Sequence, residues 1–224
     1  ELITKIREKC TGHEVVCGVS GGVDSTVLAV LLKESGVPHR AIFVNNGLLR
    51  LNEVAEVQKQ FTQLGVNLET IDAADQVLNA LAGETDPEKK RTIIGNNFLD
   101  VFWEAAANVD ILAQGTLYPD VIESATSGSI ASKIKTHHNR VDRIMDLHKE
   151  GRVLEPLAEL FKDEVRALGA TMGIPYDILH RHPFPGPGLA VRCPGEVTEE
   201  KLRIIREGDA IFMRMLKEHG HYDK

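Results

Sequence analysis

Residues 15–28 read Val-Val-Cys-Gly-Val-Ser-Gly-Gly-Val-Asp-Ser-Thr-Val-Leu, and the fold of the chain follows from this stretch. The apolar run at residues 15–19 is typical of a buried parallel strand, and apolar residues at helical spacing begin at Val27. Gly21 and Gly22 lie between the two patterns, where their backbone freedom permits a tight turn. The stretch therefore predicts a strand, a glycine turn and a helix in direct succession.

A glycine turn that leads into a helix is a potential anion site. Free backbone N–H groups and the positive end of the helix dipole meet there, and serine and threonine hydroxyls add further donors. An ordinary helix cap after a Gly-Gly turn is the alternative interpretation. The candidate anion-binding residues are Ser20, Gly21, Gly22, Val23, Asp24, Ser25 and Thr26.

The carboxylate of Asp24 limits which anions this loop can bind. The pattern G-x-x-x-x-G-K-[ST] is absent, so the loop has no lysine for a transferring γ-phosphate. A carboxylate at Asp24 would repel a bare anion, but it suits Mg²⁺ that also binds phosphate oxygens. The loop therefore predicts Mg²⁺-bound pyrophosphate, the leaving group when the α-phosphate of ATP is attacked.

Residues 20–25, Ser-Gly-Gly-Val-Asp-Ser, resemble the S-G-G-x-D-S loop of the N-type ATP pyrophosphatases. This resemblance implies that the chain adenylates its substrate. The superfamily includes synthetases for GMP, NAD, asparagine and argininosuccinate, as well as several tRNA-modifying enzymes. The loop by itself leaves the substrate open.

The composition limits the classes of protein. The 224 residues are 42% hydrophobic, enough for one large domain or one domain with a small appendage. No leader opens the chain and no apolar run approaches the roughly 18–20 residues that cross a bilayer, so we expect no membrane partner. A net charge of −7 argues against broad binding to nucleic acid. Cys10, Cys17 and Cys193 form no C-x-x-C pair, which favours a reducing cytoplasm; Cys17 is expected in the core.

Strand and helix patterns alternate along the chain, which predicts an α/β fold with a doubly wound, mainly parallel sheet. Such sheets bind ligands beyond the carboxyl ends of their strands. Val44, near the end of the second strand, is therefore a candidate to read an adenine edge through its backbone, although a plain strand end fits equally well. The expected strands lie at residues 15–19, 40–47, 67–71, 110–116 and 153–157.

Two further segments resemble GMP synthetases in particular. Residues 44–50 are similar to V-D-N-G-L-L-R, with Asn45 in place of an acid, and residues 116–124 match T-x-Y-P-D-V-I-E-S. Asp120 and Glu123 can share one face of a helical turn and hold a metal or steer a nucleophile, or they can simply mark a helix start. The resemblance favours a catalytic role for both acids, with Glu123 as a metal candidate.

Residues 134–139, Ile-Lys-Thr-His-His-Asn, follow a loop rich in serine, glycine and alanine. Paired histidines beside lysines form a cationic cluster suited to closing over phosphates, while a metal site is the less favoured alternative. In GMP synthetases the same motif belongs to a lid over the active site. The resemblance implies that Lys135 stabilises charge as the purine oxygen attacks, and that Thr136, His137 and His138 position XMP.

Two more features complete the candidate site. Lys162 is a cation at an expected helix start, where the dipole is unfavourable, so it needs a partner. The resemblance places that lysine on the leaving pyrophosphate. Residues 182–189, His-Pro-Phe-Pro-Gly-Pro-Gly-Leu, exclude a regular helix or central strand. In GMP synthetases this motif borders the XMP site, which makes candidates of Pro185, Gly186, Pro187 and Gly188.

Together the motifs resemble the ATP-pyrophosphatase part of glutamine-hydrolysing GMP synthetases. The resemblance implies a five-stranded, adenine nucleotide alpha hydrolase-like domain at residues 1–183. Residues 184–224 would form a linker and the first helix of a truncated C-terminal dimerisation domain. The implied reaction adenylates XMP with ATP and Mg²⁺ and then aminates it to GMP.

The resemblance also implies partners. Ammonia would come from a glutamine amidotransferase domain or subunit, and the full-length protein would be a homodimer. Two alternatives remain at this stage. One is an adenylating enzyme that modifies tRNA, and the other is a non-catalytic domain that binds an adenine nucleotide.

Overall fold

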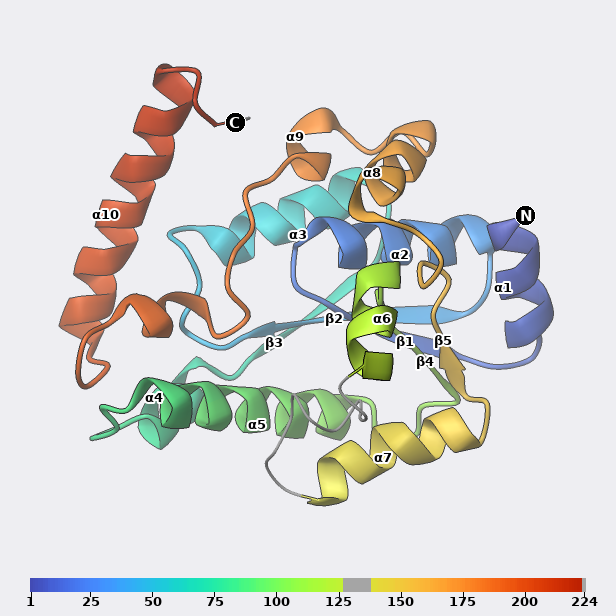
Figure 1. Ribbon diagram of the computed structural model, residues 1–224, viewed down its shortest axis with the longest axis horizontal. Helices are drawn as coiled ribbons and strands as arrows, with labels where there is room; N and C mark the ends of the chain where they lie inside the picture. Colours follow the sequence, from blue (N-terminus) through green and yellow to red (C-terminus); the bar gives the residue numbers. More distant parts are fainter. Residues whose placement is uncertain (127–137, 223–224) are drawn as a thin grey trace.

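The computed structural model describes residues 1–126 and 138–222, and the side chains of residues 1–122 and 143–222. Within these residues a five-stranded parallel sheet has the order β3-β2-β1-β4-β5 (Figure 1). All five predicted strands are confirmed, although β4 and β5 are shorter than expected. The strands are β1 (Val15–Val19), β2 (His39–Asn45), β3 (Leu68–Asp72), β4 (Ile111–Ala113) and β5 (Val153–Leu154).

Helices cover both faces of the sheet, as the doubly wound fold requires (Figure 1). One face is covered by α1 (Leu2–Cys10), α2 (Val23–Ser35), α3 (Glu53–Gln63), α8 (Lys162–Thr171) and α9 (Tyr176–Leu179). The other is covered by α4 (Ala74–Ala80), α5 (Pro87–Ala105) and α7 (His138–Lys149). The remaining helices are α6 (Tyr118–Thr126), the 3₁₀ helix η2 (Gly188–Arg192) and α10 (Glu199–Glu218). No described helix is long and apolar enough to cross a membrane.

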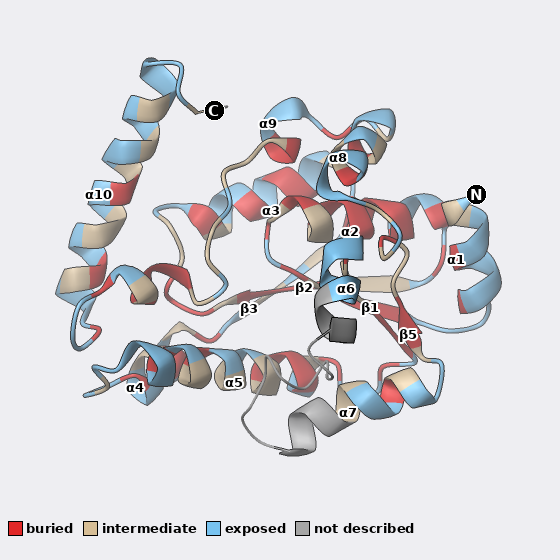
Figure 2. Cartoon of the chain, in the orientation of Figure 1, coloured by how far each residue is buried: buried red, intermediate tan, exposed pale blue. Residues whose placement is uncertain are grey.

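The strand β1 lies at the centre of the sheet and is buried from both sides (Figure 2). Val15 and Cys17 pack into the hydrophobic cluster under α2, whereas Val16 packs into the cluster under α5. This alternation is the two-residue period of a strand between two helix layers. Burial raises the pKa of the Cys17 thiol to about 12, which confirms Cys17 as a core residue.

The helix α10 is fixed to the turn that follows β2. Asp209 on α10 is buried and accepts a hydrogen bond from Arg50 Nε at 2.9 Å, and it also pairs with Arg192. Arg206, one turn earlier on α10, donates to the carbonyl oxygens of Leu49 and Gly47. These contacts fix α10 against the turn at residues 47–50, which follows β2.

Asn45 stands where the resembling sequences carry an acid, and its amide uses both of its functions. Its Nδ2 donates to Asp72 Oδ1 at 3.1 Å, while its Oδ1 accepts from the backbone N–H of Gly47 at 3.1 Å. A carboxylate could accept from Gly47 but could not donate to Asp72. The pairing of β2 with β3 therefore explains an amide at this position.

We predict that Asn45→Asp destabilises the fold in a pH-dependent way. At pH 7 two carboxylates would face each other and one hydrogen bond would be lost, so the free energy of unfolding should fall by about 1 kcal/mol. Protonation of either carboxylate removes the repulsion, so the loss should shrink as the pH falls toward 4. Urea unfolding at pH 7 and pH 4, with exposed Asn79→Asp as the control, measures this. An equal loss at both pH values would contradict it.

Candidate functional site

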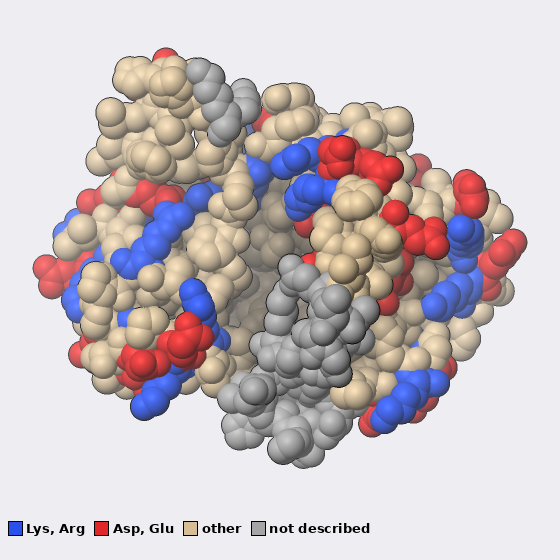
Figure 3. All heavy atoms as spheres, in the orientation of Figure 1, with Lys and Arg blue, Asp and Glu red and all other residues tan. Residues whose placement is uncertain are grey.

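A cavity of about 410 Å³ lies beyond the carboxyl ends of β1 and β2. Figure 3 shows the molecule hollowed near the middle of this face, beside the segment drawn in orange in Figure 1. The sheet topology predicts this position for a ligand. The wall comprises residues 19–24, Phe43, Val44, Asn46, Leu49, Phe98, Lys162, Arg166 and residues 181–186.

The predicted glycine loop forms one side of the cavity. Gly21 has φ +72°, a conformation that favours glycine, and Gly22 immediately precedes α2. Serine hydroxyls close the loop, since Ser20 Oγ accepts from Gly22 N at 3.3 Å and Ser25 Oγ accepts from Ser20 N at 3.2 Å. The strand, turn and helix expected from the sequence are confirmed.

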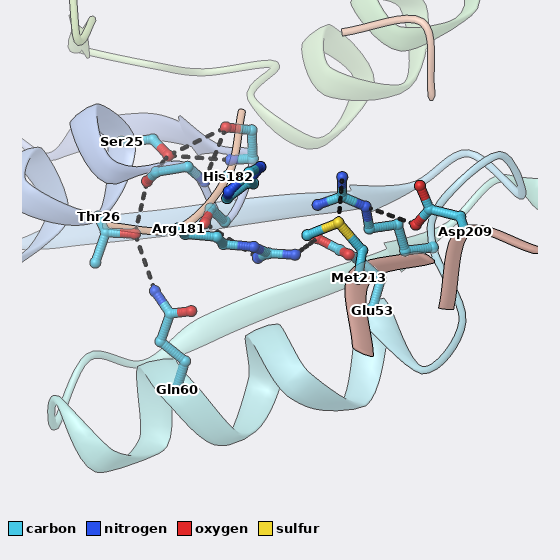
Figure 4. Close-up of polar contacts among 12 residues, drawn as sticks. Ser25, Thr26, Glu53, Gln60, Arg181, His182, Asp209 and Met213 are labelled. Carbon is cyan, nitrogen blue, oxygen red and sulfur yellow. Dashed lines mark hydrogen bonds and ion pairs between the residues drawn. The ribbon is translucent and has the colours of Figure 1, made fainter. Parts of the chain in front are cut away.

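Thr26 differs from the expectation that its hydroxyl faces the ligand. It is fully buried, donates to the carbonyl oxygen of Gly22 at 2.8 Å and accepts from Gln60 Nε2 at 3.1 Å (Figure 4). A threonine inside a helix readily bonds to the carbonyl four residues earlier. Thr26 therefore stabilises the loop from the side of α3 and does not line the cavity. Ser25, whose hydroxyl also donates to Gly22 O, is not in the cavity wall either.

Asp24 and Lys162 meet in the cavity wall. Lys162 Nζ lies 2.5 Å from Asp24 Oδ2, so the lysine at the start of α8 has the partner that the helix dipole demands. The other oxygen, Asp24 Oδ1, is buried and has no hydrogen-bond partner among the described residues. A buried carboxylate oxygen without a partner is costly, so the site favours a ligand that completes it.

The orphaned oxygen of Asp24 fits a metal bound together with phosphate. The described residues include no group of three or more His, Cys, Asp or Glu side chains that could hold a metal alone. Mg²⁺ commonly binds through one or two carboxylates, with water and substrate phosphates as its other ligands. Asp24 is suited to such a partial site.

The cavity also has an apolar part. Phe43, Val44 and Leu49 line it from the end of β2 and the following turn. Phe98 on α5 adds an aromatic ring that remains 37% exposed and stacks on Phe102 with a centroid distance of 6.1 Å. This apolar surface lies beside the polar anion loop, so the cavity suits a nucleotide, with its base on the apolar surface and its phosphates at the loop.

The proline-rich segment is divided between the cavity and the fold. Pro185 and Gly186 line the cavity, whereas Pro187 and Gly188 do not. Gly188 has φ +67°, and a Cβ there would lie 2.5 Å from the carbonyl oxygen of Leu48. Gly188 is thus required for the close approach of this segment to the turn after β2.

Of the two predicted acids and the predicted lid residues, the structure describes only the side chain of Asp120. Asp120 lies exposed at the start of α6, where its Oδ2 accepts from Leu117 N at 3.1 Å, and it is not in the cavity wall. Glu123 and His138 lie in α6 and α7, but their side chains are outside the described residues. Lys135, Thr136 and His137 are outside the described residues altogether. Their roles stay predictions.

The cavity wall includes residues that the sequence did not mark as site residues, among them Arg166, Arg181 and Phe98. Arg166 lies one helical turn beyond Lys162, so the spacing of the two cations was a usable signal. Arg181 directly precedes the His-Pro-Phe-Pro motif and also contacts Gly21 and Glu53. Phe98 carried no signal, because it resembles every other apolar residue of α5.

The comparison with protein families matches the NAD synthase family over residues 1–99. Curated relatives extend the match to the whole chain. It is 51% identical to "GMP synthase [glutamine-hydrolyzing]" of Bartonella bacilliformis and 52% identical to that of Thermus thermophilus, with 100% of this chain and 44% of each relative covered. The protein of the same name from Debaryomyces hansenii is 53% identical over 93% of this chain and 41% of its own. The chain therefore spans less than half the length of these relatives.

Solved structures show the same fold at low identity. An NMN synthetase from Francisella tularensis aligns with a TM-score of 0.61 at 16% identity, covering 100% of this chain and 93% of its own. An NH3-dependent NAD synthetase from Campylobacter jejuni aligns with a TM-score of 0.57 at 16% identity, covering 96% and 85%. The sheet and loop are thus those of the adenine nucleotide alpha hydrolase-like fold. Because about half of its residues are identical to those of these relatives along its whole length, the chain belongs to the GMP synthase family.

Proposed function

We propose that this chain is the adenylating part of an enzyme that makes GMP from XMP, ATP and ammonia. The names of its relatives support the substrates and the product. The observation that carries the proposal is Asp24 paired with Lys162 in an anion loop that lacks a Walker lysine. That pair suits pyrophosphate as the leaving group better than it suits transfer of a γ-phosphate.

The reaction has two displacements. The C2 oxygen of XMP attacks the α-phosphorus of ATP, the bond to the bridging oxygen of the β-phosphate breaks, and pyrophosphate leaves with the electron pair. Ammonia then attacks C2 of the adenylate, the C2–O bond breaks, AMP leaves, and a proton is lost from nitrogen. The AMP keeps the oxygen that came from XMP.

The loop is suited to the first displacement because its donors are already oriented. Negative charge grows on the departing pyrophosphate, next to the N-termini of α2 and α8 and the ammonium group of Lys162. Mg²⁺, held by Asp24 and the phosphates, would supply further charge neutralisation when bound. The unpartnered Asp24 Oδ1 supports this assignment.

The proposal also covers Val44, Asp120 and residues that lie outside the described part of the chain. Lys135 would stabilise charge at the α-phosphate, Asp120 and Glu123 would hold a metal or steer the nucleophile, and residues 136–138 would position XMP. Val44 would face the adenine base, in keeping with its place in the apolar wall. These assignments rest on the motifs that the chain shares with its family.

We also propose the wider setting of the enzyme. The name of the relatives, glutamine-hydrolyzing GMP synthase, supports ammonia derived from glutamine by a domain or a separate subunit. The three free buried cysteines support a cytoplasmic location. We place a domain boundary near residue 183, with residues 184–224 leading into a C-terminal dimerisation domain. Exposed apolar side chains on α10 support a further packing partner: Ile204, Ile211, Phe212 and Met215.

Product analysis tests the function directly. The natural full-length protein is incubated with ATP, Mg²⁺, XMP and ammonium, and the nucleotides are separated by chromatography. We expect AMP and GMP in equal amounts together with pyrophosphate. Formation of ADP, or intact ATP at saturating XMP, would contradict the proposal.

We predict that Lys162→Met impairs the first displacement. Loss of one preorganised cationic donor to the leaving group should lower the rate of AMP formation by about 10²–10³-fold. The measurement is the steady-state rate with both substrates saturating. Lys149→Met is the matched control, because Lys149 also pairs with an aspartate but lies exposed on α7. A Lys162→Met rate within about twofold of the unchanged protein would refute the role.

We predict that Asp24→Asn reduces the preference for metal-bound ATP. Removing the carboxylate charge should weaken binding of Mg-ATP and relieve the repulsion of metal-free ATP, so the two affinities should converge. Titration calorimetry with Mg²⁺ and with EDTA measures both. Asp146→Asn, in the surface pair with Lys149, is the control. An unchanged ratio of the two affinities would show that Asp24 holds no metal.

A further inference from the structure

Arg181 connects three parts of the molecule that are far apart in the sequence. Its Nη1 donates to the carbonyl oxygen of Gly21 at 3.3 Å, and its Nη2 pairs with Glu53 Oε1 (Figure 4). Glu53 is the first residue of α3, and its side chain is 2% exposed. The guanidinium therefore lies between the glycine loop, α3 and the proline-rich segment.

The cost of this contact suggests a use beyond stability. A buried ion pair loses hydration energy on both sides and often adds little net stability. Arginine differs from lysine because its planar group donates in two fixed directions at once. Here one direction is taken by the Glu53 carboxylate, so the other is oriented at Gly21. Glu53 thus fixes the direction in which Arg181 donates.

The orientation of the Gly21 carbonyl group determines the direction of the N–H of Gly22. In a trans peptide the C=O and the following N–H point in opposite directions from one plane. Because Arg181 holds the oxygen of Gly21, the N–H of Gly22 is directed away from the guanidinium. It donates to Ser20 Oγ at 3.3 Å, and both Ser20 and Gly22 line the cavity.

A peptide between two glycines can rotate more easily than any other, so it needs a restraint. If the Gly21–Gly22 peptide turned over, a carbonyl oxygen would face the anion and repel it. The packing opposes this rotation. A Cβ at Gly21 would lie 2.7 Å from Val57 Cγ2 and 3.1 Å from Arg181 Nη1, so the loop is in direct contact with α3 and with the guanidinium.

We propose that Arg181, oriented by Glu53, is a positioning residue that holds the Gly21–Gly22 peptide in one orientation, so that its N–H and the Ser20 hydroxyl that accepts from it stay on the side of the loop that receives the pyrophosphate of ATP. The inference deepens the proposed function and rests on the use of ATP at this site. It also links the segment at residues 181–186, which borders the cavity, to the state of the glycine loop. Order in that segment and affinity for ATP are then coupled.

The test uses the natural full-length protein and three variants: Glu53→Gln, Arg181→Lys and the double variant. Binding of Mg²⁺ with α,β-methylene-ATP is measured by calorimetry, and KM for ATP and for XMP by steady-state kinetics. Each single variant should weaken ATP binding by about tenfold and raise KM for ATP equally, with KM for XMP unchanged. The double variant should lose no more than either single variant, because the two residues act as one unit.

These readouts separate positioning from a structural role. An irreversibly misfolded fraction lowers the apparent kcat and the calorimetric stoichiometry but leaves KM and the affinity unchanged, and thermal unfolding of each variant excludes a reversible loss of folded protein. Arg181→Lys guards against a Glu53→Gln variant that fails to fold, since Arg181 is less buried and lysine keeps its charge. The matched controls are Arg40→Lys and Glu69→Gln, which alter an exposed pair between β2 and β3 outside the cavity.

The outcomes are distinct. If the unchanged protein fails to bind the nucleotide, the proposed function falls. If the unchanged protein binds it and the variants bind within about twofold, the inference is overturned and the proposed function stands. Additive losses in the double variant also overturn the inference, because Glu53 and Arg181 would then act separately.

Discussion

The N-termini of α2 and α8 lie next to each other, and the ion pair between Asp24 and Lys162 joins them. The two helices pack closely behind the pair, since a Cβ at Gly169 would lie 3.1 Å from Val27 Cγ2. Two positive dipole ends thus converge on one cavity, and a carboxylate balances part of their charge. An anion bound together with a divalent cation would complement both the helix dipoles and the unpartnered oxygen of Asp24, in keeping with the proposed function.

The surrounding fold serves to hold that convergence. The parallel sheet brings the ends of β1 and β2 to one edge, and the chain returns to this edge at α8 and again after α9. Arg181 then ties the returning chain to the glycine loop, while Asp209 ties α10 to the turn after β2. The site is consequently built from segments distant in sequence. Movement of any of these segments would shift the contacts that hold the glycine loop.

The sequence predicted local features well because their causes are local. The strand before Ser20, the turn at Gly21 and the helix after Gly22 follow from hydrophobic period and glycine content, and the dipole argument required a partner for Lys162. It did not identify Asp24 as that partner, because the pair joins residues 138 positions apart. The hydroxyl of Thr26 was misplaced for a related reason, since Gln60 of α3 holds it beneath the loop. Long-range polar contacts leave little trace in hydrophobic patterns.

In the proposed function, this cavity directs a purine oxygen at the α-phosphate of ATP. The most direct measurement supplies XMP labelled with ¹⁸O at C2, together with ATP, Mg²⁺ and ammonium, and follows the label by mass spectrometry. We predict that the ¹⁸O appears in the phosphate of AMP and is absent from pyrophosphate and GMP. Label in inorganic phosphate, or AMP that carries only solvent oxygen, would contradict it.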